Sequence, residues 1–199
     1  MKSHLSALLF LLPALPFTTA SAQRESFDAT TTRKAEITII EVLAPPPSGS
    51  ALREGRIPGG GTARLTTSKK SVTFDNIFFK FDSAELRDRA SELLIDDIAA
   101  ALKSPKLKDA RFLIEGHTCD LGEDAYNLDL SAQRADTIRR LLIKRGISAQ
   151  RLVALGFGET EIVDPVKSGD TAAEAETRRM KSRRVVLRRI LPEKAAGKK

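Results

Sequence analysis

Between residues 71 and 191, short apolar runs alternate with segments whose apolar residues recur at helical spacing, and this alternation leaves few folds open to the chain. Strands are predicted at residues 74–81, 111–115, 151–157 and 184–190. Helices are predicted at residues 87–103, 126–144 and 172–181. The order strand–helix–strand–helix–strand–helix–strand predicts an α/β fold, an α+β sandwich in which the helices pack on one mixed four-stranded sheet.

The N-terminus has the pattern of an export signal. Lys2 is followed by an apolar run at residues 5–17 and then by the small residues Ala20 and Ala22, which is typical of a signal peptide cleaved after Ala22. The alternative is a membrane anchor, but the run is shorter than the roughly 20 residues that a spanning helix needs. We therefore predict a signal peptide at residues 1–22 and an exported mature protein.

The rest of the chain divides by composition. Residues 23–43 form an N-terminal arm with a candidate strand at residues 37–43, which are rich in β-branched side chains. Residues 44–70 are predicted to be a linker, because they contain Pro-Pro-Pro and Gly-Gly-Gly runs. Residues 71–191 form the domain, and residues 192–199 form a basic tail.

Composition excludes several classes of protein. One cysteine and two histidines rule out an intrachain disulfide and argue against a structural zinc site, which needs about four ligands. We predict no cofactor and no metal. The chain has nine Phe, one Tyr and no Trp, which are few aromatic side chains for a protein that stacks on bases, and so nucleic acid is not an expected partner. The many basic residues after position 178 indicate either attraction to anionic wall polymer or lipid head groups, or simply a solvated strand face and tail.

Two polar residues lie where the helix at 126–144 should be apolar. At about 100° per residue, Arg134 and Asn127 project into the stripe that contains Leu130, Ile138 and Leu141. A guanidinium there needs an anion or other acceptors in place of water. Its partner is either a carboxylate within the fold or a carboxylate on a ligand. A third alternative is that the long side chain reaches solvent.

The loop at residues 116–122 separates the second predicted strand from this helix. Loops at strand ends often carry binding groups. Thr118 can donate or accept a hydrogen bond, and Asp120 is a local anion. Together with Arg134, Asp120 could bracket a ligand that has both an ammonium and a carboxylate. The alternative is that Thr118 and Asp120 only shape the turn and cap the helix.

Five segments carry a family resemblance when they are taken together. They are FKFDSAEL at 79–86, IEGHT at 114–118, GEDAYNLDLSAQRA at 122–135, RLVALGFGE at 151–159 and RRMKSRRVVL at 178–187. In this order and spacing, residues 79–191 resemble the OmpA-like peptidoglycan-binding domain of outer-membrane anchors, peptidoglycan-associated lipoproteins and flagellar motor stators. No single segment is specific, but the set is.

The resemblance implies a ligand and a set of binding residues. The expected ligand is the diaminopimelate of the peptidoglycan peptide stem. In the family, an Asp directly after the Thr and an Arg fifteen residues later hold its amino and carboxyl groups. The positions of this chain that match the family site, or border it, are Thr118, Asn127, Arg134, Asp82, Arg183 and Arg184, with Ser182 where the family usually has Asn.

The chain departs from the family at the Asp position. Cys119 follows Thr118, and Asp120 comes one residue late. A thiol is mostly protonated at neutral pH and does not replace a carboxylate as a fixed negative charge. Either Asp120 reaches the ligand through a rearranged turn, or the site binds weakly or binds something else. Cys119 could equally be an inert packing thiol.

Three functions stay open at this point. The first is non-catalytic peptidoglycan binding that ties an envelope component to the wall, in the periplasm and in association with the outer membrane or cell wall. The second is a cell-wall enzyme, against which stands the lack of a Ser–His–Asp set or paired catalytic carboxylates. The third is a protein-interaction scaffold whose wall binding is weakened by Cys119. An outer-membrane or envelope protein is a candidate partner for residues 23–70.

Overall fold

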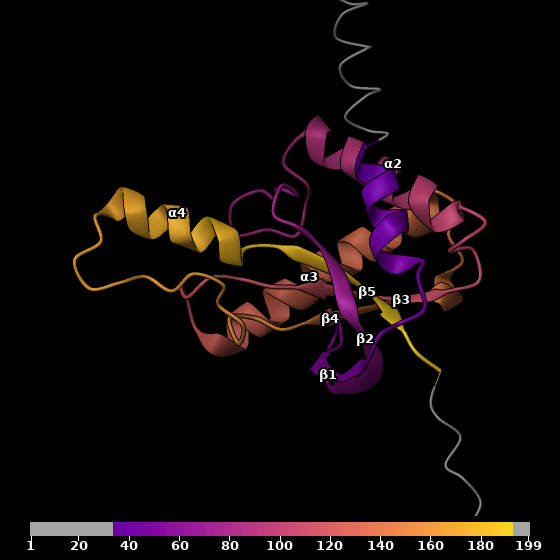
Figure 1. The fold of residues 1–199 in the computed structure, drawn as a ribbon. Coiled ribbons are helices and arrows are strands. Elements are labelled where there is room, and N and C mark those ends of the chain that lie inside the picture. Colours follow the sequence, from indigo (N-terminus) through magenta and orange to yellow (C-terminus); the bar gives the residue numbers. More distant parts are fainter. Residues whose placement is uncertain (1–33, 193–199) are drawn as a thin grey trace, which may run out of the picture.

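The computed structural model describes residues 34–192. Residues 34–43 are helical. The later elements are β1 (Ser50–Arg56), β2 (Thr62–Phe74), α2 (Arg89–Lys103), β3 (Arg111–Gly116), α3 (Asp124–Lys144), the 3-10 turn η1 (Ala149–Arg151), β4 (Leu152–Gly156), α4 (Ala172–Ser182) and β5 (Val185–Ile190) (Figure 1). The predicted signal peptide, residues 23–33 of the predicted arm and residues 193–199 of the tail lie outside the described residues. Among the described residues, no helix has the length and apolar character needed to cross a membrane.

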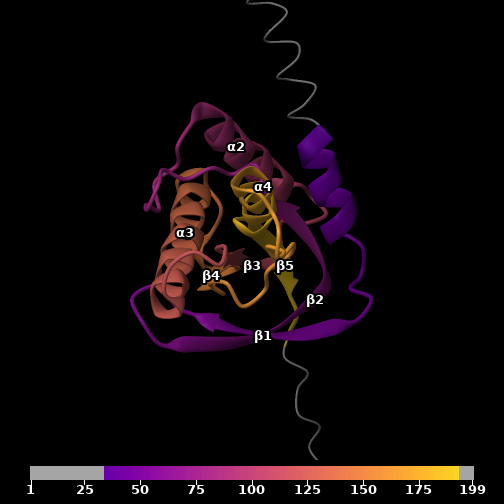
Figure 2. The same cartoon turned by 90° about the vertical axis from the view of Figure 1, so that its left-hand side faces the viewer.

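The strands form one mixed sheet in the order β1-β2-β5-β3-β4. β3 and β4 are parallel, and the other neighbours are antiparallel. The sheet curls until β1 meets β4 at a single pair, Arg56 with Gly156, which closes it into a barrel. Figure 2 shows β1 running beneath the other strands, on the side away from α2, and β2 rising from it along one side of the sheet.

The two faces of the sheet are covered differently. On one face, α2 and α3 contribute Ile98, Leu102 and Ile138 to a core that also contains Phe112 and Ile114 of β3. On the other face, a smaller cluster forms around Leu113, Leu155, Phe157 and Ile190, and Ala63 and Leu65 of β2 pack against it. The hairpin therefore covers a face that the helices leave open.

The predicted fold class is confirmed, and the sheet differs from the prediction in its number of strands. All three predicted helices appear, at 89–103, 124–144 and 172–182. Five strands rather than four are present among the described residues, because the predicted linker at 44–70 contains β1 and most of β2. The Gly59-Gly60-Gly61 run, with all three φ angles positive, lies between them. Linker composition was misleading here because the hairpin covers a partly charged sheet face and needs few apolar side chains.

Two further segments differ from the sequence prediction. Residues 37–43, predicted as a strand, are helical, and Ile39 and Leu43 lie one helical turn apart and are buried in the core. The strand predicted at 74–81 is not continuous. β2 ends at Phe74, and Phe79 makes only an isolated bridge to Leu86. Phe79 is partly buried against the core, whereas Phe81 is fully exposed, and neither extends the sheet.

Gly116 ends β3 where α3 lies closest, and this contact gives a first test of the fold. A Cβ at position 116 would lie 2.1 Å from the carbonyl oxygen of Ser131, which belongs to the α3 backbone and cannot rotate away. We expect Gly116→Ala to lower the free energy of unfolding by about 1–3 kcal/mol, because α3 must move away from the sheet. Urea unfolding followed by circular dichroism measures this, and an unchanged midpoint would show that α3 is not held as closely as described.

Candidate functional site

The loop after β3 is held by backbone hydrogen bonds to two neighbouring segments. The amide of His117 donates to the carbonyl of Arg184 (3.1 Å), and the amide of Thr118 donates to the carbonyl of Gly158 (2.9 Å). Because β3 and β4 are parallel, the segments after both strands emerge at the same edge of the sheet. The loop is thereby fixed beside the start of β5 and above the first turns of α3.

Arg134 of α3 is half-buried and carries no ion pair among the residues that the structure describes. Its Nε donates to the carbonyl of Ser83 (3.0 Å), and its guanidinium carbon lies 5.1 Å from the centre of the Phe79 ring. Burial lowers the pKa of Arg134, and the positive charge of nearby Arg183 acts in the same direction. The two terminal nitrogens of Arg134 make no hydrogen bond within residues 34–192, and so they can bind an external carboxylate.

Cys119 belongs to the loop and lies beside Arg183, just before the start of β5. Its side chain is buried, and Nη1 of Arg183 lies 3.6 Å from its sulfur. Arg183 also forms an ion pair with Glu176 of α4. The position that carries Asp in the resembled family is therefore occupied here by a thiol in contact with a guanidinium.

Asp120 is paired with α4. Both of its carboxylate oxygens accept hydrogen bonds from Arg179, at 2.7 Å from Nε and 3.2 Å from Nη2. These bonds lower the pKa of Asp120 and keep it ionised. The sequence analysis anticipated neither this ion pair with α4 nor a role for Arg179, and among the described residues Asp120 makes no contact with Arg134.

Asp82 lies on the other side of Arg134. It has a positive φ of 49°, unusual for a residue other than glycine, and its carboxylate accepts a hydrogen bond from the Tyr126 hydroxyl. That hydrogen bond is the main reason why the pKa of Tyr126 is raised. The negative charge of Asp82 also acts on Arg134, and so Asp82 borders the same site.

Asn127 of α3 and Thr118 of the loop are both buried. Nδ2 of Asn127 donates to the carbonyl of Leu121 (3.0 Å) and to a carboxylate oxygen of Glu159 (2.6 Å), with a longer contact to the carbonyl of Cys119 (3.4 Å). The side chain of Asn127 therefore holds the loop in shape. The Thr118 hydroxyl is buried and has no hydrogen-bond partner among the described residues.

Arg184 belongs to a different cluster. Its Nη1 donates to the carbonyls of Glu161 (3.1 Å) and Ser182 (3.2 Å), and its charge interacts with Glu161 and Glu115. The structure therefore brings Arg134, Cys119, Arg183 and Asp82 together at one site and places Arg184 outside it.

That second cluster is built around a buried carboxylate under the hairpin. Oε1 of Glu115 accepts from Nε of Arg53 (2.9 Å) and from Nε of Arg188 (2.8 Å). Nε2 of His117 lies 3.6 Å from Oε2 of the same carboxylate. Burial raises the pKa of Glu115, but the contact with His117 and the two arginine charges together hold it below its ordinary value. Sequence analysis missed this cluster. The available signal was that Arg53, Glu115 and Arg188 each lie within a strand that also contains apolar residues, where a buried charge needs a partner.

Sequence analysis also missed three residues that shape the ligand site itself. Phe79 lies against Arg134, Tyr126 fixes Asp82, and Arg179 holds Asp120. Each lies within one of the five segments that carry the resemblance. The sequence therefore places these three residues within the resembling segments, but it does not show which side chains they contact.

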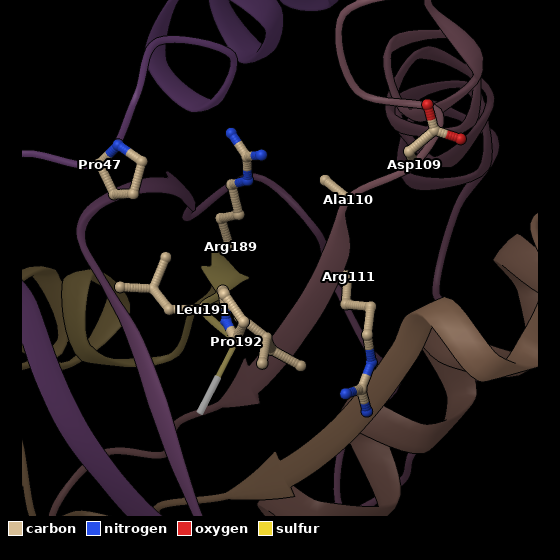
Figure 3. A pocket seen from close by; sticks show the side chains of 8 residues that line it. Pro47, Asp109, Ala110, Arg111, Arg189, Leu191 and Pro192 are labelled. Atoms are coloured by element: carbon tan, nitrogen blue, oxygen red, sulfur yellow. The ribbon is translucent and has the colours of Figure 1, made fainter. Parts of the chain in front are cut away.

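A pocket of about 510 Å³ lies at the opposite end of β3 (Figure 3). Pro47, Asp109, Arg111, Arg189 and Leu191 are among its lining residues. Arg111 and Arg189 point in different directions (Figure 3), and so they do not converge on one anion. Within residues 34–192, no group of three or more His, Cys, Asp or Glu side chains could hold a metal ion.

Fold and site together define a class of protein: a mixed α/β domain with a half-buried, unpaired arginine above a strand-end loop. The family model that describes the OmpA family matches residues 78–179, just over half of the chain. The chain belongs to the OmpA family.

Several named proteins are similar to the chain. It is 34% identical over 128 residues to the peptidoglycan-binding protein ArfA of Mycobacterium bovis, a match covering 64% of this chain and 36% of that protein. It is 29% identical over 140 residues to a peptidoglycan-associated lipoprotein of Pseudomonas putida, covering 70% of this chain and 78% of that one. Outer membrane protein A of Yersinia pseudotuberculosis is 31% identical over 106 residues, 53% of this chain and 30% of that protein.

The matched region spans only about a third of ArfA and of outer membrane protein A. Among solved structures, the peptidoglycan-associated lipoprotein from Burkholderia pseudomallei is similar with a TM-score of 0.46 and 28% identity, over 59% of this chain and 88% of that one.

Proposed function

We propose that this protein binds cell-wall peptidoglycan without catalysis and ties an envelope component to the wall. The observation that carries the proposal is Arg134: a half-buried guanidinium with two terminal nitrogens unused among the described residues. A planar guanidinium in this state is suited to a carboxylate that arrives from outside. Membership of the OmpA family and the similarity to the peptidoglycan-binding protein ArfA support peptidoglycan as the source of that carboxylate.

The carboxylate of diaminopimelate in the peptide stem is the proposed ligand group at Arg134. Arg183, Thr118 and Asp82 border the position where it would lie. We propose no catalysis at this site, whose groups around Arg134 are the Arg183 guanidinium, the Asp82 carboxylate with the Tyr126 hydroxyl, and the buried Cys119 thiol. The proposed location is the periplasm, in association with the outer membrane or the wall, after removal of residues 1–22.

The contact of residues 23–70 with an outer-membrane or envelope protein also remains a proposal. Within the described part of that range, Ile37 and Leu52 are exposed apolar side chains on the helical segment and on β1. The second candidate function is that of a protein-interaction scaffold whose binding to the wall is weakened. The pairing of Asp120 with Arg179, which leaves no loop carboxylate beside Cys119, favours it.

Sedimentation with purified sacculi distinguishes the two functions. We expect the wild-type protein to pellet with sacculi and Arg134→Ala to remain in the supernatant, because the variant lacks the group that binds the carboxylate. Arg140→Ala is the matched control, since Arg140 is an exposed arginine of the same helix that pairs with Asp136. A wild-type protein that stays in the supernatant, or equal pelleting of all three proteins, would contradict wall binding through this site.

A further inference from the structure

Most basic residues from position 178 to the end of β5 have partners within the domain. Each of the following forms an ion pair with an aspartate or a glutamate: Arg178, Arg179, Lys181, Arg183, Arg184 and Arg188. Arg189 differs from them, because it forms no ion pair with any residue in the range 34–192. The structure therefore divides the basic run of the sequence into cations that stabilise the domain and cations that are left over.

Three further cations without ion pairs lie near Arg189, at the same end of the sheet. β2, β5 and β3 are adjacent strands there, and Ile190 of β5 stands opposite Arg111 of β3. Lys69 and Lys70 lie in the irregular stretch of β2 that faces the same part of β5. Lys69, Lys70 and Arg111 are exposed and, within the described part of the chain, unpaired. We call Lys69, Lys70, Arg111 and Arg189 the basic end of the domain.

The pocket at the basic end combines cations with apolar side chains. Arg111 and Arg189 line it, and so do Leu191 and Pro47 (Figure 3). Among the described residues that line it, Asp109 is the one acid. The two arginines point in different directions, which does not suit a single anion but suits several anions spread over a surface (Figure 3).

Two kinds of extended anion could meet such a surface. A phosphate-bearing polymer of the wall would interact through charge alone. A bilayer that contains anionic phospholipid presents separate phosphates above an apolar layer, and peripheral proteins bind it through basic and apolar side chains together. The apolar lining beside the cations therefore favours the bilayer.

We propose that the basic end docks on a bilayer surface that contains anionic phospholipid, with its four cations against lipid head groups and Leu191 at the boundary of the apolar layer. The proposal goes beyond wall binding, because the loop at residues 116–122 begins at the other end of β3, about 17 Å away along a strand of six residues. A domain docked in this way presents that loop on the side away from the membrane.

Flotation of the full chain with lipid vesicles tests the proposal. We expect the wild type to bind vesicles of phosphatidylglycerol and phosphatidylcholine in equal parts far more tightly than vesicles of phosphatidylcholine alone, which control for binding by apolar segments. The double variant Lys69→Gln, Arg111→Gln should bind the anionic vesicles about tenfold to thirtyfold less tightly, since each basic residue near an anionic surface contributes about fivefold.

The matched control is the double variant Lys80→Gln, Arg89→Gln. It removes the same charge from two exposed side chains, one before α2 and one at its first residue. Because these positions lie away from the basic end, binding to anionic vesicles should change by less than about threefold. Equal losses in the two double variants, or equal binding of the wild type to both kinds of vesicle, overturn the proposal.

Leu191→Ser distinguishes a bilayer from a polyanion, because only the bilayer takes up an apolar side chain. This variant should bind anionic vesicles about threefold to tenfold less tightly, and wild-type binding would overturn the lipid assignment. If circular dichroism shows that it does not fold, the two double variants still decide the question.

Sedimentation with sacculi separates this proposal from wall binding. Lys69→Gln, Arg111→Gln should pellet with sacculi as the wild type does, because Arg134 is unchanged. Loss of that pelleting would assign the basic end to a wall polymer and overturn docking on lipid. A wild type that binds anionic vesicles but not sacculi would support the proposal and contradict the proposed function alone.

Discussion

Arg134→Lys is expected to weaken binding of a diaminopimelate-containing muropeptide by about tenfold to a hundredfold while the domain stays folded, the loss expected when one charged hydrogen bond disappears. Lysine keeps the positive charge but cannot form two parallel hydrogen bonds to a carboxylate. It also loses the Nε contact to the carbonyl of Ser83, which orients the side chain. Isothermal titration with the purified muropeptide measures the change.

The matched control is Arg140→Lys on the exposed part of the same helix, where Arg140 is 62% exposed and pairs only with neighbouring side chains of α3. That variant should titrate as the wild type does. Circular dichroism confirms that both variants are folded. If both Arg134→Lys and Arg134→Ala keep wild-type affinity, Arg134 is a structural residue and the ligand binds elsewhere.

Glu115→Gln is expected to lower the free energy of unfolding by about 3 kcal/mol, the lower end of the range for removing one partner of a buried ion pair. The glutamine leaves Arg188 without a carboxylate under the hairpin. We expect a loss of stability at the lower end of this range because Arg53 keeps its ion pair with Glu161, in which Nη1 of Arg53 lies 2.5 Å from Oε1 of Glu161. The chain has no tryptophan, and so urea unfolding is best followed by circular dichroism.

Glu54→Gln is the control for this variant. Glu54 also belongs to a hairpin ion pair, but both it and Arg64 are largely exposed, and an exposed pair contributes about 0–1 kcal/mol.

The pH dependence of stability gives a second check on the role of Glu115. Folding lowers the pKa of Glu115, so its ionised form stabilises the domain at neutral pH, and this contribution is lost as pH falls through the folded-state pKa. The difference between wild type and Glu115→Gln should therefore shrink below about pH 4. A Glu115→Gln protein as stable as Glu54→Gln would show that the hairpin does not depend on this carboxylate.

The helices and the inner strands could be predicted because their sequences satisfy local rules. α2 begins at Asp88, whose side chain accepts from the amide of Ser91, and α4 begins with a capping box between Thr171 and Glu174. Arg134 could be singled out because it lies within the apolar stripe of its own helix. Such signals depend on residues three or four positions apart, and so they are readable from the chain alone.

The hairpin could not be predicted because its reason for folding lies in a distant strand. β1 and β2 have few apolar side chains, and the partner of Arg53 is Glu115, 62 residues later. The same limit applies to Asp120, which the sequence left between two roles. Its ion-pair partner Arg179 lies 59 residues away, and so this contact could not be predicted from the loop sequence.

The amino-acid sequence was enough to predict the fold class and the order of helices and inner strands, and the family resemblance added that Cys119 stands where an Asp is expected. The tertiary structure alone decided that Arg183 contacts Cys119, that Arg184 points to another cluster, and that Asp120 is held by α4. The physical reason is that helix and strand formation follows periodicities of a few residues. The charge at a binding site depends instead on which side chains distant segments bring within a few ångströms of one another.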